Sequence, residues 1–374
     1  MEILDKILNS KLLNYEKLNE LLFPFIKKYK KESVVNIYID VWDWVKQLYN
    51  PDITENLNSL VNNEKYTIAS HLINIVSHYR HYFASRHQMY TTFYFIVSTN
   101  KCKELTNKFP DYKKDFYEKR LNINNQYFGV LNSIMKTNFE ICKIYIEYIP
   151  HVYWIDTNNL DPRGMLHCIL ELNNKLDNIG EIQKIKNEGS LNIILSNDDL
   201  LLQSLLLPNI INIQSRSEKS RILYKDNIIS TLLEGSKKTN TTNLLPEYIT
   251  LINPLMSFKN YNIKGLRNMG GIKAVKFIEK AVENNIINLD SNPLIDKNSM
   301  IQMFKDEEEF NKYLLNFELI NNEIIYSTNY KFYNSLLNIL LIDRVNPLEI
   351  RKVNEVYFNK EPVLLEYCFE GEEY

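Results

Sequence analysis

The strongest constraint on the fold is a series of short apolar segments that alternate with longer helical patterns. The short segments have the length and the β-branched and aromatic content of strands, and they lie at Val34–Asp40 (VVNIYID), Thr91–Ser98 (TTFYFIVS), Val152–Asp156 (VYWID), 192–195 (NIIL) and 209–214 (NIINIQ). Helical patterns occupy 65–90, 123–149 and 165–187. This alternation predicts an α/β fold with a mostly parallel central sheet flanked by helices.

The first and the fourth of these strands run directly into acidic residues. Val34–Asp40 ends on Asp40, and the strand at 192–195 is followed by Ser196-Asn197-Asp198-Asp199 before a helical pattern begins. The carboxyl ends of parallel strands share one edge of the sheet, and α/β folds place their chemistry at that edge. Asp40 and Asp198 are therefore the first candidates for a functional site.

A basic and aromatic segment follows the second predicted strand. It reads Phe109-Pro110-Asp111-Tyr112-Lys113-Lys114, with Arg120 behind it, in a stretch (101–120) that shows little strand or core pattern. Cations and stacking rings in such a segment can meet a phosphate backbone or a single-stranded end. We predict nucleic-acid contacts for Tyr112, Lys113, Lys114 and Arg120. The alternative is a solvated basic loop.

A second candidate for nucleic-acid binding is the stretch Ile263–Ile278 (IKGLRNMGGIKAVKFI). Gly265 and Gly270 bracket a tight turn, and an apolar-periodic helix follows. Small residues at a helix N-terminus allow backbone N–H groups to approach a phosphate. Nearby charge comes from Lys264, Arg267 and Lys273. The alternative is an ordinary αα-hairpin.

The composition narrows the class of protein only partly. The 374 residues carry 44 Lys and Arg against 46 Asp and Glu, so net charge does not identify a nucleic-acid binder, although it permits a basic groove. The excess of Asn, Ile and Lys is typical of an AT-rich genome, such as that of a virus, a phage or an AT-rich microbe. The scattered cysteines have no metal-ligand spacing and indicate reduced thiols in a cytosolic setting; they are Cys102, Cys142, Cys168 and Cys368.

We expect a cytoplasmic protein, in a host cell or a virion if it is viral, with no membrane partner. The N-terminus MEILDKILNSK carries acids and no long apolar run, unlike a secretion signal. No segment approaches the roughly 20 apolar residues of a membrane span.

The order of these motifs resembles the 5′-nuclease superfamily, the flap endonucleases and the 5′–3′ exonucleases of phages and bacterial polymerases. The resemblance runs from about residue 34 to about residue 280. It rests on four stretches in this order: the strand that ends on Asp40, the basic segment at 109–120, the strand followed by Ser196-Asn197-Asp198, and the glycine turn at 263–278. It implies that residues 109–120 lead into an arch over a single-stranded 5′ end. It also implies that the glycine turn is a helix-hairpin-helix element that grips duplex DNA.

This resemblance also suggests a division of the chain. We predict an N-terminal helical extension at 1–32 and a 5′-nuclease-like α/β core at 33–240. A helix-hairpin-helix-like DNA-binding element at 241–290 and a helical C-terminal extension at 291–374 would follow. Within the extension, the acidic run Asp306–Glu309 is expected to begin a helix.

Members of the superfamily cut phosphodiesters with two divalent metal ions held by converging carboxylates. Two Mg²⁺ ions about 4 Å apart repel each other by about 17 kcal/mol at an effective dielectric constant of about 20, so several acids are needed to hold them. An active member of this type would need Mg²⁺ or Mn²⁺.

The acids that the resemblance requires are mostly missing. Ser98 stands at the end of the second strand, and Leu200 stands where a second Asp should follow Asp198. The family's Glu-Ala-Asp-Asp turn corresponds to Asp161-Pro162-Arg163-Gly164, and its acidic segment before the hairpin falls near Phe258 and Tyr261.

The remaining metal candidates are Asp40 and Asp198, with Asp161 as a third, and they would form a vestigial or single weak site. Ser/His/Asp, Cys/His and phosphate-loop arrangements are not found, so no catalytic residue is predicted.

Three functions are consistent with these residues. The first is a nucleic-acid-binding protein with an inactive metal site, accessory to viral or phage DNA replication, repair or transcription. The second is an active, divergent 5′–3′ exonuclease or flap endonuclease, which needs Asp43, Asp156 or Asp199 to converge on Asp40 and Asp198. The third is a protein-interaction or virion subunit that uses the fold as a scaffold for a replication, transcription or virion partner.

Overall fold

The computed structural model describes residues 12–29, 31, 33–41, 43–44, 67–97, 102–114, 143, 149–157, 161, 163–164, 166–167, 169–170, 190–216, 219–234, 242–289 and 297–321. Ser98, Arg120 and the predicted C-terminal segment beyond residue 321 lie outside the described residues. So do nearly all of the predicted helix at 123–149 and most of the predicted helix at 165–187.

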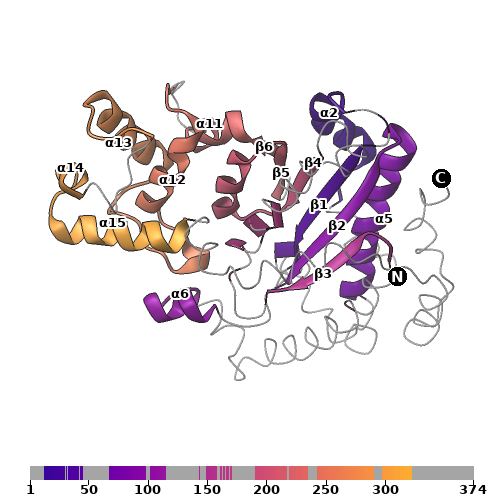
Figure 1. Ribbon diagram of the computed structural model, residues 1–374, viewed down its shortest axis with the longest axis horizontal. Coiled ribbons are helices and arrows are strands. Elements are labelled where there is room, and N and C mark those ends of the chain that lie inside the picture. The colour runs from indigo at the N-terminus through magenta and orange to yellow at the C-terminus, as the bar shows by residue number, and fades with distance from the viewer. Residues whose placement is uncertain are drawn as a thin grey trace, which may run out of the picture.

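Six described strands form one sheet in the order β3-β2-β1-β4-β5-β6 (Figure 1). They are β1 (Val34–Asp40), β2 (Tyr90–Val97), β3 (Val152–Asp156), β4 (Leu191–Leu195), β5 (Ile210–Arg216) and β6 (Lys219–Tyr224). All neighbouring pairs are parallel except β5 and β6, which are antiparallel. The predicted α/β fold with a mostly parallel sheet is confirmed, and β6 is an addition that its polar start (KSR) concealed.

The strand order places a topological switch point between β1 and β4. From β1 the chain proceeds outward through β2 and β3, and it then returns to add β4, β5 and β6 on the other side of β1. Crossover connections leave the sheet in opposite directions at such a point, and ligands bind at the carboxyl ends of the two strands. Asp40 ends β1, and Asp198 follows β4.

Both faces of the sheet are buried, as expected for a parallel sheet. Along β1, Val35, Ile37 and Ile39 face a core that includes α2 (Tyr15–Ile26) and α5 (Thr67–His87). Tyr38 points to the opposite core. Figure 1 shows α2 and α5 beside the strands and the later helices at the other end of the molecule.

The chain becomes mainly helical after residue 245 in its described part, as predicted. The α-helices described there are α12 (Ile249–Ile252), α13 (Gly271–Glu283), α14 (Lys297–Ile301) and α15 (Glu307–Ile320), and α11 (Ile228–Leu232) precedes them. Asp306 caps α15 by accepting the N–H of Glu309 at 2.8 Å, which confirms that the acidic run begins a helix. None of the described helices is long and apolar enough to cross a lipid bilayer.

The segment between α12 and α13 is held by close backbone packing. A Cβ atom added at Gly265 would lie 2.4 Å from the backbone carbon of Met256 and 2.5 Å from the carbonyl oxygen of Leu255. Asn316 of α15 donates its side-chain N–H groups to the carbonyls of Pro254 at 2.9 Å and Lys264 at 3.1 Å. Gly265 therefore serves the packing of the turn, and α15 fixes the turn from outside.

Replacing Gly265 with alanine is expected to lower the free energy of unfolding by about 3 kcal/mol, because the methyl group would displace backbone rather than a flexible side chain. Gly270 is the matched control, since a Cβ there meets nothing within 4 Å. Gly270→Ala should cost less than about 1 kcal/mol. Urea unfolding of both variants measures the difference, and equal losses would contradict the packing argument.

Candidate functional site

The carboxyl ends of β1 and β4 meet around Ser196. Asp40 Oδ2 accepts the Ser196 hydroxyl at 3.3 Å, and the backbone N–H of Asp198 donates to the same Oγ at 3.1 Å. Asp40 Oδ1 accepts the N–H of Asp43 at 3.2 Å. The structure thus brings the two acids predicted from the strand ends together at one edge of the sheet.

Asp198 is occupied as a helix cap. Its Oδ1 accepts the N–H of Leu200 at 3.0 Å at the start of the 3₁₀ helix η2 (Asp199–Leu206). Its Oδ2 accepts the hydroxyl of Tyr261, which comes from the turn before α13. Burial raises the pKa of Asp198 above its ordinary value, although the charge of Arg163 opposes that rise.

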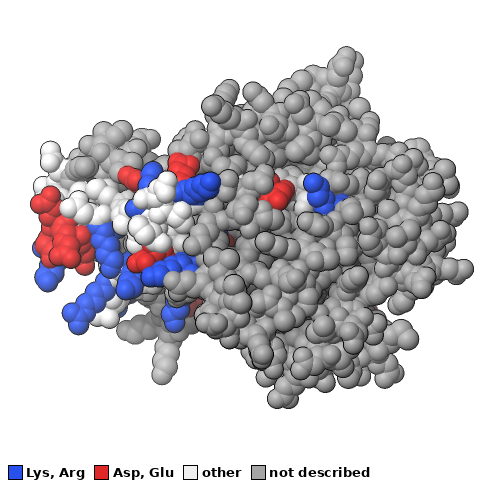
Figure 2. Space-filling model, turned by 90° about the horizontal axis from the view of Figure 1, so that it is seen from below, with Lys and Arg blue, Asp and Glu red and all other residues white. Residues whose placement is uncertain are grey.

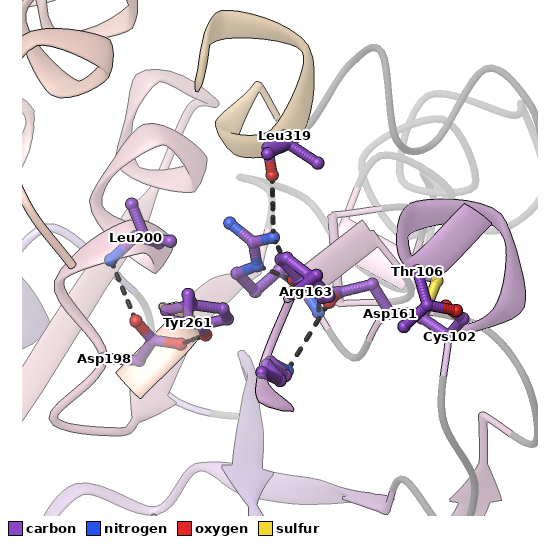
Figure 3. Close-up of polar contacts among 10 residues, drawn as sticks. Cys102, Thr106, Asp161, Arg163, Asp198, Leu200, Tyr261 and Leu319 are labelled. Carbon is purple, nitrogen blue, oxygen red and sulfur yellow. Dashed lines mark hydrogen bonds and ion pairs between the residues drawn. The ribbon is translucent and has the colours of Figure 1, made fainter. Parts of the chain in front are cut away.

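A buried ion pair lies beside this edge (Figure 3). Arg163 Nε donates to Asp161 Oδ1 at 2.9 Å, and the Arg163 backbone N–H donates to the same oxygen at 3.0 Å. Asp161 Oδ2 accepts the Tyr112 hydroxyl at 2.5 Å. Arg163 Nη2 donates to the Tyr112 hydroxyl at 2.7 Å and to the carbonyl of Leu319 at 3.1 Å.

Lys113 adds a second cation to this ion pair. Its Nζ lies 3.5 Å from Asp161 Oδ2 and 4.6 Å from the centroid of the Tyr261 ring. The Arg163 Cζ lies 4.5 Å from the same ring centroid. Lys113 adopts a left-handed backbone (φ 52°), and its N–H donates to the Tyr261 carbonyl at 3.0 Å. We call Tyr112, Lys113, Asp161, Arg163, Asp198 and Tyr261 together the Arg163 cluster.

The charges within the Arg163 cluster stabilise one another. Burial alone would raise the pKa of Asp161, but the charges of Arg163 and Lys113 outweigh it and hold that pKa well below its usual range. Burial opposes the charge of Arg163, yet Asp161 keeps the Arg163 pKa well above its ordinary value. Asp161 and Arg163 are therefore both ionised at neutral pH.

Apolar side chains surround the cluster. They form a small separate core of Cys102, Leu105, Tyr112, Leu200, Tyr261, Ile263, Leu319 and Ile320. Leu200, which stands where the resemblance requires an acid, is fully buried in this core. Burial in this core raises the pKa of the Cys102 thiol to about 11, so the thiol is neutral.

The structure corrects three predictions for the basic segment. Tyr112 is 0% exposed, so it supports Asp161 and Arg163 rather than stacking on a nucleic-acid base. The Lys113 side chain is only 14% exposed and points at Asp161. The expectation that 101–120 lacks core pattern is also wrong, because Cys102 and Leu105 are buried and Lys103–Lys108 forms α6.

The sequence contains a signal for this burial. Cys102, Leu105, Phe109 and Tyr112 recur at the three- and four-residue spacing of one helical face. The basic residues between them masked this pattern. Lys114 does lie on the surface, where its Nζ is 3.5 Å from Asp111 Oδ1.

The divalent ions implied by the resemblance do not fit these residues. Both oxygens of Asp161, which the sequence offers as a third metal ligand, already accept Arg163 and Tyr112. Mg²⁺ needs oxygen ligands and retained waters, whereas a guanidinium and an apolar core lie here. In the part of the chain that the structure describes, three or more His, Cys, Asp or Glu side chains are nowhere grouped to hold a metal ion.

The predicted hairpin residues lie mostly on the surface. Lys264, Arg267, Gly270 and Lys273 are exposed, whereas Gly265 is buried. Lys259, Lys276 and Lys280 are also exposed there, and residues 259–280 hold six basic residues and one acid. Figure 2 shows a face of the molecule on which the described basic and acidic side chains intermingle.

The buried face of α13 packs onto the rest of the fold. Ala274, Val275, Ile278 and Ala281 form its apolar stripe. A Cβ at Gly271 would lie 2.8 Å from the Leu232 carbonyl oxygen of α11. α13 is therefore packed against the fold, and the basic side chains of Lys273, Lys276 and Lys280 lie outward.

No family model matches the chain, and no curated protein sequence matches it. Two of the similar solved structures are the D15 protein of phage T5 co-crystallised with metal ions and the bacteriophage T5 D15 flap endonuclease as a pseudo-enzyme–product complex with DNA and metal ions. Each is 12% identical to this chain with a TM-score of 0.50, and each match covers 89% of this chain and 98% of the other. The likeness thus extends beyond the stretch from about residue 34 to about residue 280 that the motifs indicated. The chain has a 5′-nuclease-like fold.

Proposed function

We propose that this protein binds duplex or branched DNA through its hairpin and does not cut it, as an accessory component of DNA replication, repair or transcription. The observation that carries the proposal is the Arg163–Asp161 ion pair at the edge of the sheet. The carboxylate of Asp161 is paired with the guanidinium of Arg163, and an apolar core surrounds this ion pair. Cleavage by two metal ions requires several free carboxylates at that place.

Binding is supported by the exposed hairpin and the N-terminus of α13. Gly270 precedes the 13-residue helix, and a Cβ placed there meets nothing within 4 Å, so the helix end is open to a ligand. Backbone N–H groups at such an end, with Lys264, Arg267 and Lys273 around them, suit a phosphate. The solved neighbour in complex with DNA has a similar fold, which favours the same class of ligand.

The alternative is an active metal-dependent 5′–3′ exonuclease or flap endonuclease, and one observation favours it. Asp43 lies at the same edge as Asp40 and Asp198, because its Oδ2 accepts the Asn197 backbone N–H at 2.9 Å and the Asn197 side chain at 3.0 Å. Asp199 contributes less to this alternative, since its Oδ1 accepts the side chain of Gln214 on β5 at 3.2 Å.

Fluorescence anisotropy with a labelled 5′-flap duplex tests the binding. We expect the affinity to be the same, within about twofold, in EDTA and in Mg²⁺ at constant ionic strength, because binding through lysine and arginine needs no metal ion. Absence of binding to duplex, flap and single strand alike would contradict the proposal. Co-purification of a protein in that case would favour the scaffold function.

A further inference from the structure

Residues 258–263 form a small closed loop in the turn before α13, and we call them the Tyr261 loop. The N–H of Phe258 donates to the carbonyl of Ile263 at 2.8 Å, and the N–H of Ile263 donates back to the Phe258 carbonyl at 3.2 Å. These two bonds make an antiparallel bridge at the base of the loop. The bridge and the 3₁₀ turn η6 (Lys259–Tyr261) together give the loop a defined backbone.

The side chain of Tyr261 anchors this loop in the Arg163 cluster (Figure 3). Tyr261 is 5% exposed, and its ring centroid lies 4.5 Å from Arg163 Cζ and 4.6 Å from Lys113 Nζ. Its hydroxyl donates to the Asp198 carboxylate, and its carbonyl accepts the Lys113 N–H at 3.0 Å. Cations beside an aromatic ring and a hydrogen-bonded hydroxyl group hold a buried tyrosine in one place. The loop is thus fixed to the sheet edge and to the segment after α6.

The anchored loop presents one exposed lysine next to the basic residues of the hairpin. Lys259 follows Phe258, and Lys264 follows Ile263, so the two lysines lie one residue from the same backbone bridge. Both side chains are exposed. Bridged Cα atoms are about 5 Å apart and consecutive Cα atoms about 3.8 Å, which places the Cα atoms of the two lysines within about 13 Å of each other. Lys259 therefore extends the surface that carries Lys264 and Arg267.

The backbones of Lys264 and Lys259 are held in place by different contacts. The Lys264 carbonyl accepts a side-chain N–H of Asn316 on α15 at 3.1 Å. Lys259 lies two residues before Tyr261 in the same 3₁₀ turn, on the part of the loop that Tyr261 attaches to the Arg163 cluster. The position of Lys259 therefore depends on Tyr261 more directly than the position of Lys264 does.

We propose that Lys259 is a further contact for a phosphate of DNA and that Tyr261 is the residue that positions it. This inference rests on the proposed binding of DNA through the hairpin. A lysine on a fixed loop binds a phosphate without the entropic cost of ordering that loop, so the buried anchor increases the affinity. A phosphate contact of this kind adds affinity and carries no base specificity.

A double-mutant cycle on DNA affinity tests the inference, by fluorescence anisotropy with a labelled duplex. Lys259→Ala should weaken binding about fivefold at about 0.15 M salt and lower the slope of log affinity against log salt by about 1. Tyr261→Ala should do the same, because the lysine loses its fixed position. The variant with both changes should also bind about fivefold more weakly than wild type, rather than about 25-fold, because the two residues act through one contact.

Tyr313→Ala is the matched control, since it truncates another buried tyrosine of the helical half, whose hydroxyl donates to the Leu251 carbonyl at 3.2 Å. The affinity of the folded control should stay within about twofold of wild type, because a loss of stability alone does not remove a phosphate contact. If either alanine variant does not fold, the leucine variant of the same tyrosine takes its place. An unchanged affinity in Lys259→Ala or Tyr261→Ala, losses that multiply in the double variant, or an equal loss in the control would overturn the inference alone. A wild-type protein that binds no DNA would overturn both the inference and the proposed function.

Discussion

Asp161→Asn is expected to lower the free energy of unfolding by about 3–5 kcal/mol at neutral pH, because it leaves the buried guanidinium of Arg163 without a counter-charge. Asparagine keeps the size of the side chain and one carbonyl oxygen, so the loss reports charge rather than volume. Urea unfolding at pH 7 measures it.

Asp198→Asn is the matched control for that variant. It removes a carboxylate from the same cluster, but burial raises the pKa of Asp198, so ionisation of Asp198 opposes folding. The variant is therefore expected to be as stable as the wild-type protein at pH 7, or more stable. Equal large losses for the two variants would contradict the assignment of Asp161 as the counter-ion of Arg163.

Acidification should change the contributions of Asp161 and Asp198 to the free energy of unfolding in opposite directions. The folded pKa of Asp161 is depressed, so its stabilisation is complete above the unfolded value of about 3.9 and declines as pH falls towards the folded value. The folded pKa of Asp198 is raised, so its penalty is present at neutral pH and disappears as acidification protonates the carboxyl group. The difference between Asp161→Asn and wild type should hold from about pH 6 to 8 and shrink below about pH 4, and the difference for Asp198→Asn should disappear as acidification protonates that carboxyl group.

Removing the hairpin charges has the second large effect. Replacing Lys264, Arg267 and Lys273 together by alanine is expected to weaken binding to duplex DNA about 100-fold at about 0.15 M salt. The slope of log affinity against log salt should fall by about 3, since each lost phosphate contact contributes about 1. Anisotropy titrations at several salt concentrations measure both quantities.

A matched triple variant separates local contacts from net charge. The control replaces three lysines outside the hairpin by alanine, which removes the same formal charge. They are Lys17 on α2, Lys225 directly after β6 and Lys312 on α15. That variant should keep its affinity within about threefold. Equal weakening of the two triple variants, or an unchanged affinity in the hairpin variant, would contradict the hairpin as the DNA-binding surface.

The sheet and its edge could be predicted from the sequence because their signals are local. Val34–Asp40 and Val152–Asp156 match observed strands, and the strands before Asp198 and near residue 210 differ by one or two residues at their ends. A strand of this kind is recognised from a run of apolar residues that stops at a polar turn, and both features involve only residues that are neighbours along the chain. The positions of Asp40 and Asp198 follow from that pattern and from parallel pairing.

The Arg163 cluster could not be predicted in the same way, because it depends on residues far apart in sequence. From the sequence, Arg163 is only a basic residue at a position where the family has an acid. Its distant partners in the structure are Tyr112, Tyr261 and the Leu319 carbonyl. Burial of Tyr112 beneath basic neighbours, and the return of α15 to the sheet edge, are properties of the tertiary fold. The helical spacing from Cys102 to Tyr112 is the one local signal that pointed to it.

Incubation of the purified protein with a 5′-labelled flap duplex in Mg²⁺ and in Mn²⁺ tests most directly whether the fold binds without cutting. The bound fraction is measured by anisotropy in the same reaction, and the products are resolved on a denaturing gel. We predict that the DNA is bound and stays intact. Cleavage by the wild-type protein that Asp198→Ala abolishes would contradict this account and establish an active nuclease.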